Sequence, residues 1–213
     1  MGEIKAAGLR SIFQAIGDAI EADKGRLSEL DGVIGDADHG VTMSIGFTAV
    51  NEALGKLDAN ADPTTVFNTA AKSFLNAVGA SSGPLYGTAF MRAGAAVKGK
   101  AAIDRDALAD CIAAMAKGMQ DRGKAERGEK TMMDAWLPAA DAIQEAKARG
   151  DDPVACLEAA VGAAEAGAEA TKAMLATKGR ASRLGERALG HIDPGAASAV
   201  TILKAMTEAV RKL

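Results

Sequence analysis

The residues most suited to chemistry lie in one short stretch, DGVIGDADHGVTM, at residues 31–43. Asp31, Asp36 and Asp38 fall within eight residues and are followed directly by His39. Carboxylates this close repel one another and raise each other's pKa, so a bound cation is their natural partner. Carboxylate oxygens suit one or two Mg²⁺ ions better than zinc, which prefers nitrogen and sulfur. Calcium is a weaker alternative, because the spacing and closing glutamate of an EF-hand are missing.

This stretch also has a purely structural interpretation, in which it is a solvated acidic turn and Asp38 caps the helix that follows. The stretch alone supports the two interpretations equally. The metal interpretation carries a further expectation, because Mg²⁺ in proteins usually shares its coordination shell with phosphate oxygens. His39 would then donate a hydrogen bond to one of those phosphates.

Two glycine-containing stretches have the residue types of phosphate-binding loops. GASSGPLYG, residues 79–87, places serine hydroxyls and free backbone N–H groups just before a helix, where an anion is favoured. GRASRLGER, residues 179–187, carries Arg180, Arg183 and Arg187, whose guanidinium groups would offset the aspartates and stabilise a transferring phosphoryl group. Each stretch alone has a simpler alternative, a serine-capped turn and a solvated basic loop.

A third stretch, HIDPGA at residues 191–196, contains Asp193, which is either a helix cap or a nucleotide contact. Met132 and Leu85 either line a slot for a base or belong to the core. The sequence has no Walker motif and no G-x-G-x-x-G after a strand. Taken together, the acidic loop, the phosphate-type loop and the arginine-containing loop indicate a site for a nucleotide bound with Mg²⁺.

Composition sets the class of protein. The chain has 213 residues and a formal charge of −3, which argues against a nucleic-acid binder. No leader segment or membrane-length apolar run is present, so we expect a cytoplasmic protein without membrane contact. Cys111 and Cys156 lie in helical patterns and are expected to be buried free thiols. Because no linker-like segment divides residues 1–213, we expect a single domain.

Alanine-rich segments with apolar periodicity predict an all-α fold of eight helices. The Asp-Pro pairs at Asp62, Asp152 and Asp193 are expected to start helices, because aspartate caps an N-terminus and proline suits the first position. Asp104 is a fourth expected cap. The expected helices cover residues 4–23, 40–57, 63–78, 84–98, 105–119, 131–149, 153–175 and 194–213, with a shorter turn at 25–30.

Short connections between helices of similar length favour an antiparallel up-and-down bundle or barrel. In this arrangement the connections after the first, third, fifth and seventh helices share one end of the molecule. These connections contain the aspartates, the serine loop, the segment DRGKAERGEKTM and the arginine-containing loop. The other connections are short and contain no comparable motif. We therefore expect one functional site at this end.

Five motifs carry a resemblance to a known family: DGVIGDADHG, SSGPLYG, GEKTMMDA, GRASRLGER and GHIDPGA. In this order and at these intervals they resemble the nucleotide-binding L subunit, or L domain, of dihydroxyacetone kinases, from near Asp31 to the C-terminus. The resemblance implies an eight-helix antiparallel barrel that binds ADP or ATP at one end through two Mg²⁺ ions. Ala37, Thr42, Ala80 and Arg183 depart from the common pattern, but the aspartates are intact.

The resemblance also assigns roles to individual residues. It implies that Asp31, Asp36 and Asp38 bind the metal ions, and that Arg180 and His39 act on the transferring phosphoryl group. The residues that it places around the nucleotide are His39, Gly40, Val41, Thr42, Ser82, Gly83, Gly123, Met132, Arg180, Asp193 and Pro194.

A separate K subunit or domain in this family holds the keto-sugar covalently through a histidine. His39 and His191 are the only histidines here, and both lie inside nucleotide motifs, so the resemblance implies a K partner. In phosphotransferase-coupled systems ADP stays bound as a coenzyme, and an M subunit rephosphorylates it from phosphoenolpyruvate. Related L chains use free ATP, some with a tetrulose such as erythrulose. We expect the coupled form, with the ATP-dependent kinase as the alternative.

Two other functions remain open from the sequence. A nucleotide-state sensor would bind a transcription regulator in a manner that depends on ADP or ATP. A helical cation-binding scaffold would be stabilised by Mg²⁺ with no further gain from ADP. The sequence leaves the sugar, the phosphoryl donor and the oligomeric state undetermined.

Overall fold

The computed structural model describes residues 3–213, which form eight α-helices. They are α1 (Ala6–Ile34), α2 (His39–Gly55), α3 (Pro63–Ala77), α4 (Ser82–Ala96), α5 (Arg105–Gly123), α6 (Met133–Arg149), α7 (Pro153–Ala170) and α8 (Pro194–Arg211). Three 3-10 turns, η1 (Thr171–Ala173), η2 (Ala181–Arg183) and η3 (Gly185–Ala188), lie between α7 and α8. The predicted all-α class is confirmed.

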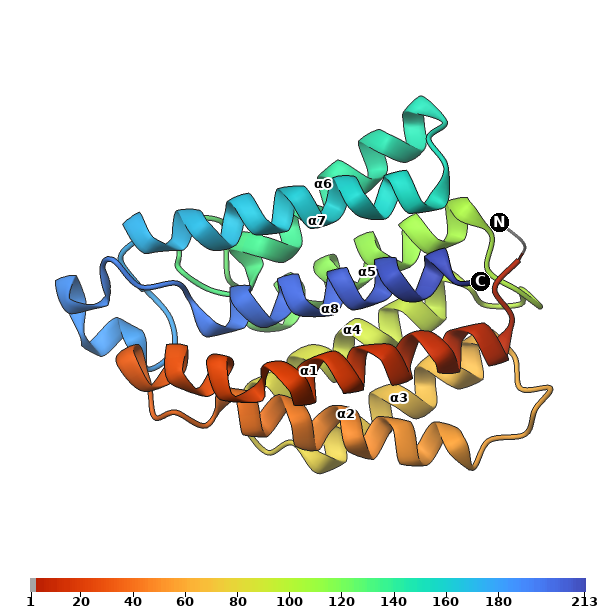
Figure 1. Ribbon diagram of the computed structural model, residues 1–213, viewed down its shortest axis with the longest axis horizontal. Helices are drawn as coiled ribbons and strands as arrows, with labels where there is room; N and C mark the ends of the chain where they lie inside the picture. The colour runs from red at the N-terminus through yellow and green to blue at the C-terminus, as the bar shows by residue number, and fades with distance from the viewer. Residues whose placement is uncertain (1–2) are drawn as a thin grey trace.

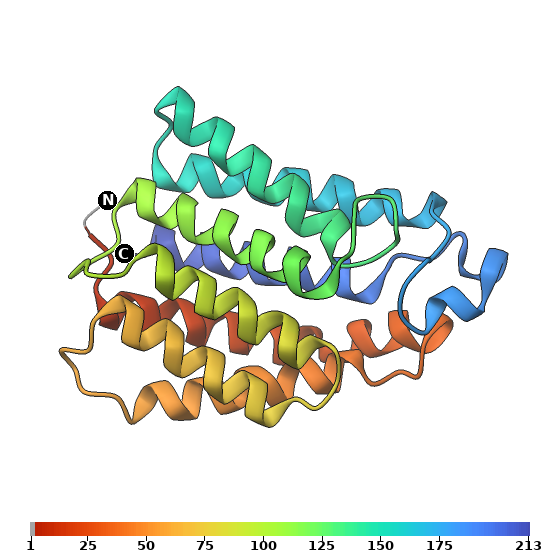
Figure 2. The same cartoon turned by 180° about the vertical axis from the view of Figure 1, so that it is seen from behind.

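The helices close into a ring, because each packs against the next in the chain and α8 packs against α1. Figure 1 shows the start of α1 and the end of α8 at one end, together with the α2–α3, α4–α5 and α6–α7 connections. Figure 2 shows from behind that the other four connections lie at the opposite end. We call this second end the site end and the first the far end. The predicted antiparallel barrel is confirmed.

The first helix is longer than predicted. A helix ending at Asp23 and a separate turn were expected, but α1 is continuous to Ile34. The buried stripe continues through Ile20, Leu27 and Ile34, and its burial outweighs the cost of about 1 kcal/mol for each of the two glycines in this part of the helix. Asp31 therefore projects from the last turn of a helix rather than from a loop, which gives it a fixed position.

Other helix boundaries at the site end also differ from the prediction. α4 begins at Ser82 rather than at residue 84, and α5 continues to Gly123 rather than to residue 119. α7 ends at Ala170, and a 3-10 turn replaces the expected continuation to residue 175. Ser82 and Gly123 are consequently helical residues at the edge of the site.

The expected aspartate caps are confirmed at the far end. The Asp62 carboxylate accepts a hydrogen bond from Thr65 N at 2.7 Å, and the Asp104 carboxylate accepts one from Ala107 N at 2.8 Å. Asp152 caps α7 in the same way. Each aspartate satisfies N–H groups of its own helix, so these helix starts are specified by local sequence.

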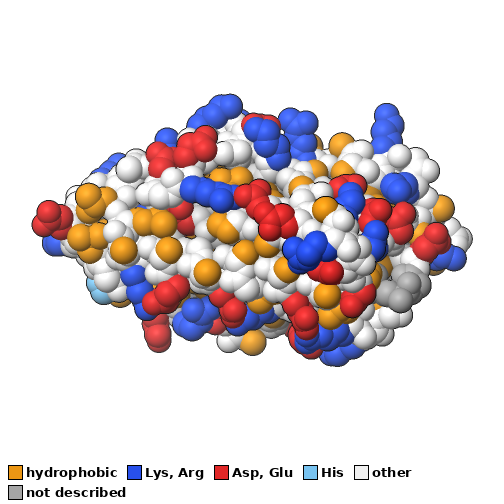
Figure 3. Space-filling model, turned by 90° about the horizontal axis from the view of Figure 1, so that it is seen from above, with side chains coloured by type: hydrophobic (Ala, Val, Ile, Leu, Met, Phe, Trp, Pro, Cys, Tyr) orange, Lys and Arg blue, Asp and Glu red, His pale blue; other side chains and the backbone are white. Residues whose placement is uncertain are grey.

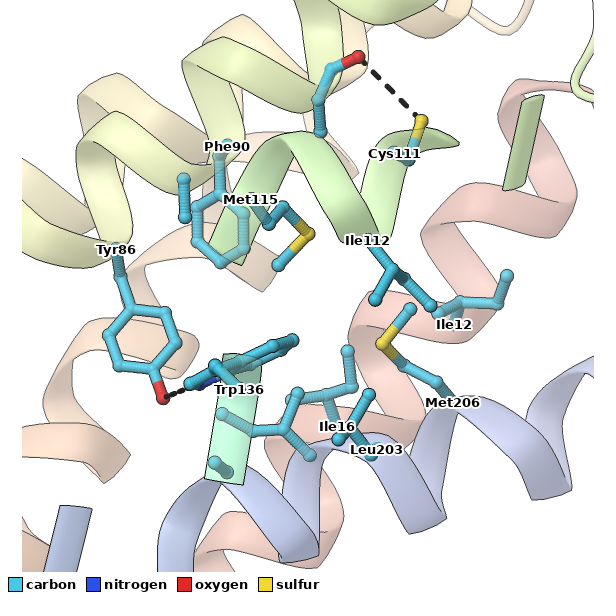
Figure 4. Packing of buried hydrophobic residues seen from close by; sticks show 14 of the residues in the cluster. Ile12, Ile16, Tyr86, Phe90, Cys111, Ile112, Met115, Trp136, Leu203 and Met206 are labelled. Atoms are coloured by element: carbon cyan, nitrogen blue, oxygen red, sulfur yellow. Dashed lines mark hydrogen bonds between the residues drawn. The ribbon is translucent and has the colours of Figure 1, made fainter. Parts of the chain in front are cut away.

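The interior of the ring is a single apolar core to which all eight helices contribute. Figure 4 shows side chains of α1, α4, α5, α6 and α8 meeting there, among them Ile16, Phe90, Trp136 and Leu203. Trp136 Nε1 donates a hydrogen bond of 3.5 Å to the hydroxyl of Tyr86, so the indole N–H is satisfied inside the core. This core holds the helix ends, and with them the site, in a fixed relation.

The remaining sequence expectations concern cysteines and surface. Cys111 and Cys156 are buried free thiols, as predicted, and burial raises the pKa of Cys111 to about 12. Figure 3 shows cationic and anionic side chains interspersed over one face. Among residues 3–213, each helix is too short or too polar to cross a membrane.

Candidate functional site

Three carboxylates gather where α1 ends and α2 begins. Asp31, Asp36 and Asp38 each offer an oxygen atom, and these atoms lie within 4.8 Å of one another. Asp31 is only 8% exposed, Asp38 is partly buried and Asp36 is exposed. Such a set of hard, charged oxygen donors fits Mg²⁺. The structure thus brings the three predicted metal ligands together.

Backbone hydrogen bonds hold Asp31 in this position. Its Oδ2 atom accepts from Asp38 N at 2.9 Å and from His39 N at 3.2 Å, at the start of α2. Asp31 therefore caps α2 from the neighbouring helix. Asp38 occupies the N-cap position of α2 but makes no capping bond with its side chain, so the interpretation of Asp38 as a helix cap is wrong.

Arg180 is the charge partner of the aspartates. Its Nη1 atom lies 2.5 Å from Asp36 Oδ1 and 3.6 Å from Asp38 Oδ2, although it comes from the distant α7–α8 connection. Burial raises the pKa of Asp38, the neighbouring charge of Asp36 raises it further, and Arg180 acts in the opposite direction. A permanent cation thus lies beside the acidic cluster, where it can contact an anion bound at the same place.

A cavity of about 700 Å³ opens beside the carboxylates. It has the size of a small-molecule site, and its wall combines charged, hydroxyl and backbone groups with apolar side chains such as Ile34, Leu85 and Met119. This combination fits a nucleotide, which has a charged and an aromatic part. The predicted site residues that line the cavity are Asp31, Asp38, His39, Thr42, Ser82, Gly123, Met132, Arg180, Asp193 and Pro194.

Four predicted site residues are not among the residues that line the cavity. Asp36 lies with the other aspartates and pairs with Arg180, and Val41 is 47% exposed. A Cβ atom on Gly40 would lie 2.1 Å from the Lys24 carbonyl oxygen, and one on Gly83 would lie 2.0 Å from the Val78 carbonyl oxygen. The packing of α2 and α4 therefore already requires these two glycines. A contact of Gly40, Val41 or Gly83 with a nucleotide stays a prediction.

His39 is oriented by the start of α8. Its Nε2 atom lies 2.9 Å from Ser198 Oγ, and the Ser198 hydroxyl donates to the Gly195 carbonyl at 3.0 Å. Because the only hydroxyl hydrogen of Ser198 is engaged there, we assign the imidazole hydrogen to Nε2, which leaves Nδ1 as an acceptor. Burial lowers the pKa of His39, and Asp31 opposes this shift. Burial thus favours the neutral imidazole, and because its hydrogen is engaged by Ser198, this arrangement does not support the expected donation from His39 to a phosphate.

Asp193 is both a helix cap and a cavity residue. Its Oδ2 atom accepts from Ala196 N at 2.8 Å. Asp193 is partly buried, and this burial raises the pKa of its carboxyl group to about 7, whereas the hydrogen bond from Ala196 and the charge of Lys130 lower it. The two interpretations of this residue from sequence are thus compatible.

Among the residues of the cavity wall that sequence reasoning missed are Lys130, Tyr86, Gly195 and Ser198. Lys130 belongs to the motif GEKTMMDA, and a charged residue inside a matched motif was a usable signal. Tyr86 and Ser198 gave no sequence signal of a role in the site, because helical periodicity places them in the core. Burial raises the pKa of Tyr86 to about 12, so its hydroxyl keeps its hydrogen.

Comparisons with known proteins agree with this geometry. Residues 33–208 match the family model described as the DAK2 domain. The chain is 43% identical over 202 residues to the ADP-binding subunit DhaL of PEP-dependent dihydroxyacetone kinase 2 from Listeria innocua, covering 94% of this chain and 93% of the relative. It is 38% identical to the ADP-binding subunit DhaL of the Escherichia coli PEP-dependent kinase, covering 92% and 93%.

A solved structure shares the fold. The crystal structure of the dihydroxyacetone kinase from C. freundii in complex with AMP-PNP and Mg²⁺ superposes with a TM-score of 0.72 at 28% identity. The match covers 98% of this chain but only 35% of that chain, so this protein spans about a third of the larger kinase. On the family model and these relatives, the chain belongs to the DAK2 domain family, that of the nucleotide-binding L subunits and L domains of dihydroxyacetone kinases.

Proposed function

We propose that this chain is the ADP- or ATP-binding subunit of a keto-sugar kinase that acts on dihydroxyacetone. One observation carries the proposal: three carboxylates within 4.8 Å of one another face Arg180 beside a cavity of nucleotide size. The relatives named ADP-binding subunits of dihydroxyacetone kinases support it over nearly the full chain.

In this proposal Asp31, Asp36 and Asp38 hold Mg²⁺. Three carboxylates offer six oxygens, more than one Mg²⁺ usually takes from protein, which supports two ions. Bound Mg²⁺ neutralises charge on the phosphate oxygens. Phosphoryl transfer needs mainly positioning and charge stabilisation, and Arg180 is the side chain placed to supply positive charge. His39 packs beside the phosphates and is kept in one orientation by Ser198.

The remaining nucleotide contacts come from the helix ends around the cavity. Thr42, Ser82 and Gly123 line the cavity near the aspartates, whereas Met132 and Pro194 supply apolar surface for the base. The acceptor hydroxyl belongs to a sugar held by another chain, a K subunit. The larger kinase from C. freundii, of which this chain matches 35%, supports a division of labour between two units.

The donor that we propose is bound ADP, rephosphorylated by an M subunit at the expense of phosphoenolpyruvate. The names of the Listeria innocua and Escherichia coli relatives support this form. The alternative is a kinase that uses free ATP and a tetrulose. It is favoured by one relative, the L-erythrulose 1-kinase of Mycolicibacterium smegmatis, which is 36% identical over 92% of this chain and 34% of that protein.

The test begins with protein purified without added nucleotide. The protein is denatured, any released nucleotide is identified, and the native form is incubated with labelled ATP and Mg²⁺. We expect tightly held ADP that exchanges slowly. A freely exchanging site would instead support the ATP-dependent kinase. If neither ADP nor ATP binds in the presence of Mg²⁺, the proposed function is wrong.

A further inference from the structure

Lys130 is an unusual residue beside the cavity. It is 1% exposed, and its backbone has a left-handed conformation with φ of 58°. Both features are unfavourable for lysine, because its charge loses hydration and its Cβ is crowded at positive φ. Glycine would satisfy this backbone without strain. The presence of lysine therefore points to a role of the side chain.

The ammonium group of Lys130 joins two distant segments. Nζ donates hydrogen bonds to the carbonyl oxygens of Thr171 and His191, both at 2.5 Å. Thr171 follows the last residue of α7, where the helix dipole favours a cation, and His191 lies two residues before the cap of α8. Residues 174–190, which we call the arginine loop, run between these two points and carry Arg180.

Neighbouring contacts secure the same loop. Gly190 N donates to the Lys172 carbonyl at 2.8 Å, which closes the loop at its base. Glu129, the residue before Lys130, contacts the loop near its start. Its carboxylate accepts a hydrogen bond from Thr177 Oγ1 at 2.8 Å, and its carbonyl accepts one from Thr177 N at 3.2 Å. Glu129 thus contacts the loop near its start, and Lys130 contacts the residues just before and just after the loop.

We propose that Lys130 is a positioning residue that clamps both ends of the arginine loop and thereby holds Arg180 against the acidic cluster. The clamp also sets the entry of α8, because the next residues carry Asp193, whose backbone N–H donates to Thr171 Oγ1 at 2.9 Å. The inference rests on the proposed function only for its effect on nucleotide binding. The clamp itself belongs to the ligand-free protein.

Charge gives Lys130 a second effect on the same wall. Lys130 lowers the pKa of the Asp193 carboxyl, whereas the buried Asp134 raises it. Asp193 in turn acts on the buried hydroxyl of Tyr86. The other ionisable side chains that line the cavity are Asp31, Asp38, His39, Arg122, Lys178 and Arg180. Lys130 is the cation whose charge acts on Asp193, so its removal leaves the buried Asp134 and the partly buried Asp193 without that counter-charge.

The first test uses trypsin on the ligand-free protein. The arginine loop contains cleavage sites at Lys178, Arg180, Arg183 and Arg187. In Lys130→Met we expect cleavage in this loop to accelerate about tenfold or more, because local opening no longer breaks two charge-assisted hydrogen bonds. Lys124→Met is the matched control, since Lys124 also has a left-handed backbone in the same connection but is exposed. Cleavage elsewhere should stay unchanged.

The second test separates charge from packing. The carboxyl carbon of Asp193 is assigned by NMR with the help of Asp193→Asn and titrated in each variant. We expect its midpoint to rise in Lys130→Met and to stay in place in Lys124→Met and Lys130→Arg. Mg²⁺–ADP affinity, measured by calorimetry, should fall about tenfold in Lys130→Met. The faster cleavage of the arginine loop and the raised Asp193 midpoint in the same variant would account for this loss.

If Lys130→Met does not fold, Lys130→Gln takes its place, because glutamine keeps a donor but is shorter and uncharged. Trypsin cleavage and an Asp193 midpoint that both match Lys124→Met would overturn the clamp. Failure of the wild type to bind any nucleotide, with loop cleavage still accelerated in the variant, would instead refute the proposed function and leave the clamp in place.

Discussion

The two ends of the barrel start their helices in different ways. At the far end α3, α5 and α7 are each capped by the aspartate directly before them, Asp62, Asp104 or Asp152. At the site end α2 is capped by Asp31 from another helix, and α4 begins at Ser82 with no side-chain cap at its N-cap residue. These three far-end starts therefore use local caps, whereas α2 at the site end uses a tertiary one, and α8 is the site-end helix that keeps a local cap, Asp193.

The difference reflects what each end has to do. A local cap stabilises a helix whatever surrounds it, and it makes the helix start insensitive to ligands. A cap supplied by a carboxylate of another helix couples two helices, and an N-terminus without its own cap leaves N–H groups for an anion. The site end thus gives up some local stability in exchange for groups that can bind a ligand.

The largest expected effect comes from the aspartate that forms the tertiary cap. Asp31→Asn keeps the acceptor for the N–H groups of α2 but removes a charged metal ligand. We expect Mg²⁺–ADP affinity to fall about 100-fold or more, because a buried charge loses its partner. Calorimetry measures this, and Asp104→Asn at the far end is the control that should bind normally. An unchanged affinity in Asp31→Asn would show that this carboxylate is not a metal ligand.

The next effect compares two glycines. A Cβ on Gly83 would lie 2.0 Å from the Val78 carbonyl oxygen, whereas one on Gly55 at the far end meets nothing within 4 Å. Gly83→Ala should lower the free energy of unfolding by about 2–3 kcal/mol through overpacking. Gly55→Ala should be neutral or raise it by about 0.5 kcal/mol. Urea denaturation tests both, and equal stability of the two variants would contradict the packing role of Gly83.

A smaller effect contrasts two capping aspartates with opposite pKa shifts. Burial raises the pKa of Asp193 to about 7, whereas the hydrogen bond from Ala107 lowers the pKa of the exposed Asp104. Native Asp193 binds its proton more tightly than the unfolded chain does, so its contribution to stability is present at low pH and lost as pH rises toward 7. The contribution of Asp104 is present above about pH 4 and lost in acid.

Denaturation curves between pH 3 and 8 check this contrast. Asp193→Asn should remove part of the decline in stability between about pH 4 and 7, and Asp104→Asn should remove part of the loss at lower pH. Both variants keep an oxygen acceptor for the cap, so the comparison isolates ionisation. If Asp193→Asn follows the wild-type pH profile, burial does not raise the pKa of this carboxyl in the native protein.

The smallest effect concerns a far-end cap alone. Asp62→Ala removes the acceptor for Thr65 N and should lower the free energy of unfolding by about 1 kcal/mol. Mg²⁺–ADP affinity should not change, because Asp62 is not a residue of the cavity wall. A binding defect in this variant would mean that the two ends of the barrel are coupled through the helices.

Far-end features were the most predictable from sequence. The caps at Asp62 and Asp152 are readable because the interacting atoms lie two to three residues apart. The length of α1 was not readable in this way, since a glycine and a run of charged residues resemble a helix end when the buried stripe is unknown. At the site, the aspartate cluster was predictable from spacing, but the role of Lys130 was not.

The sequence by itself determined the helical class, the helix starts with local caps and the residue types of a Mg²⁺–nucleotide site, because these follow from propensity, short-range hydrogen bonds and the chemistry of carboxylates. Only the tertiary structure decided that Asp31 caps α2, that Arg180 meets Asp36, and that Lys130 contacts Thr171. The Asp31 cap depends on where α1 ends relative to α2, and the other two contacts join residues far apart in the chain, which meet only when the barrel closes and brings the helix ends together.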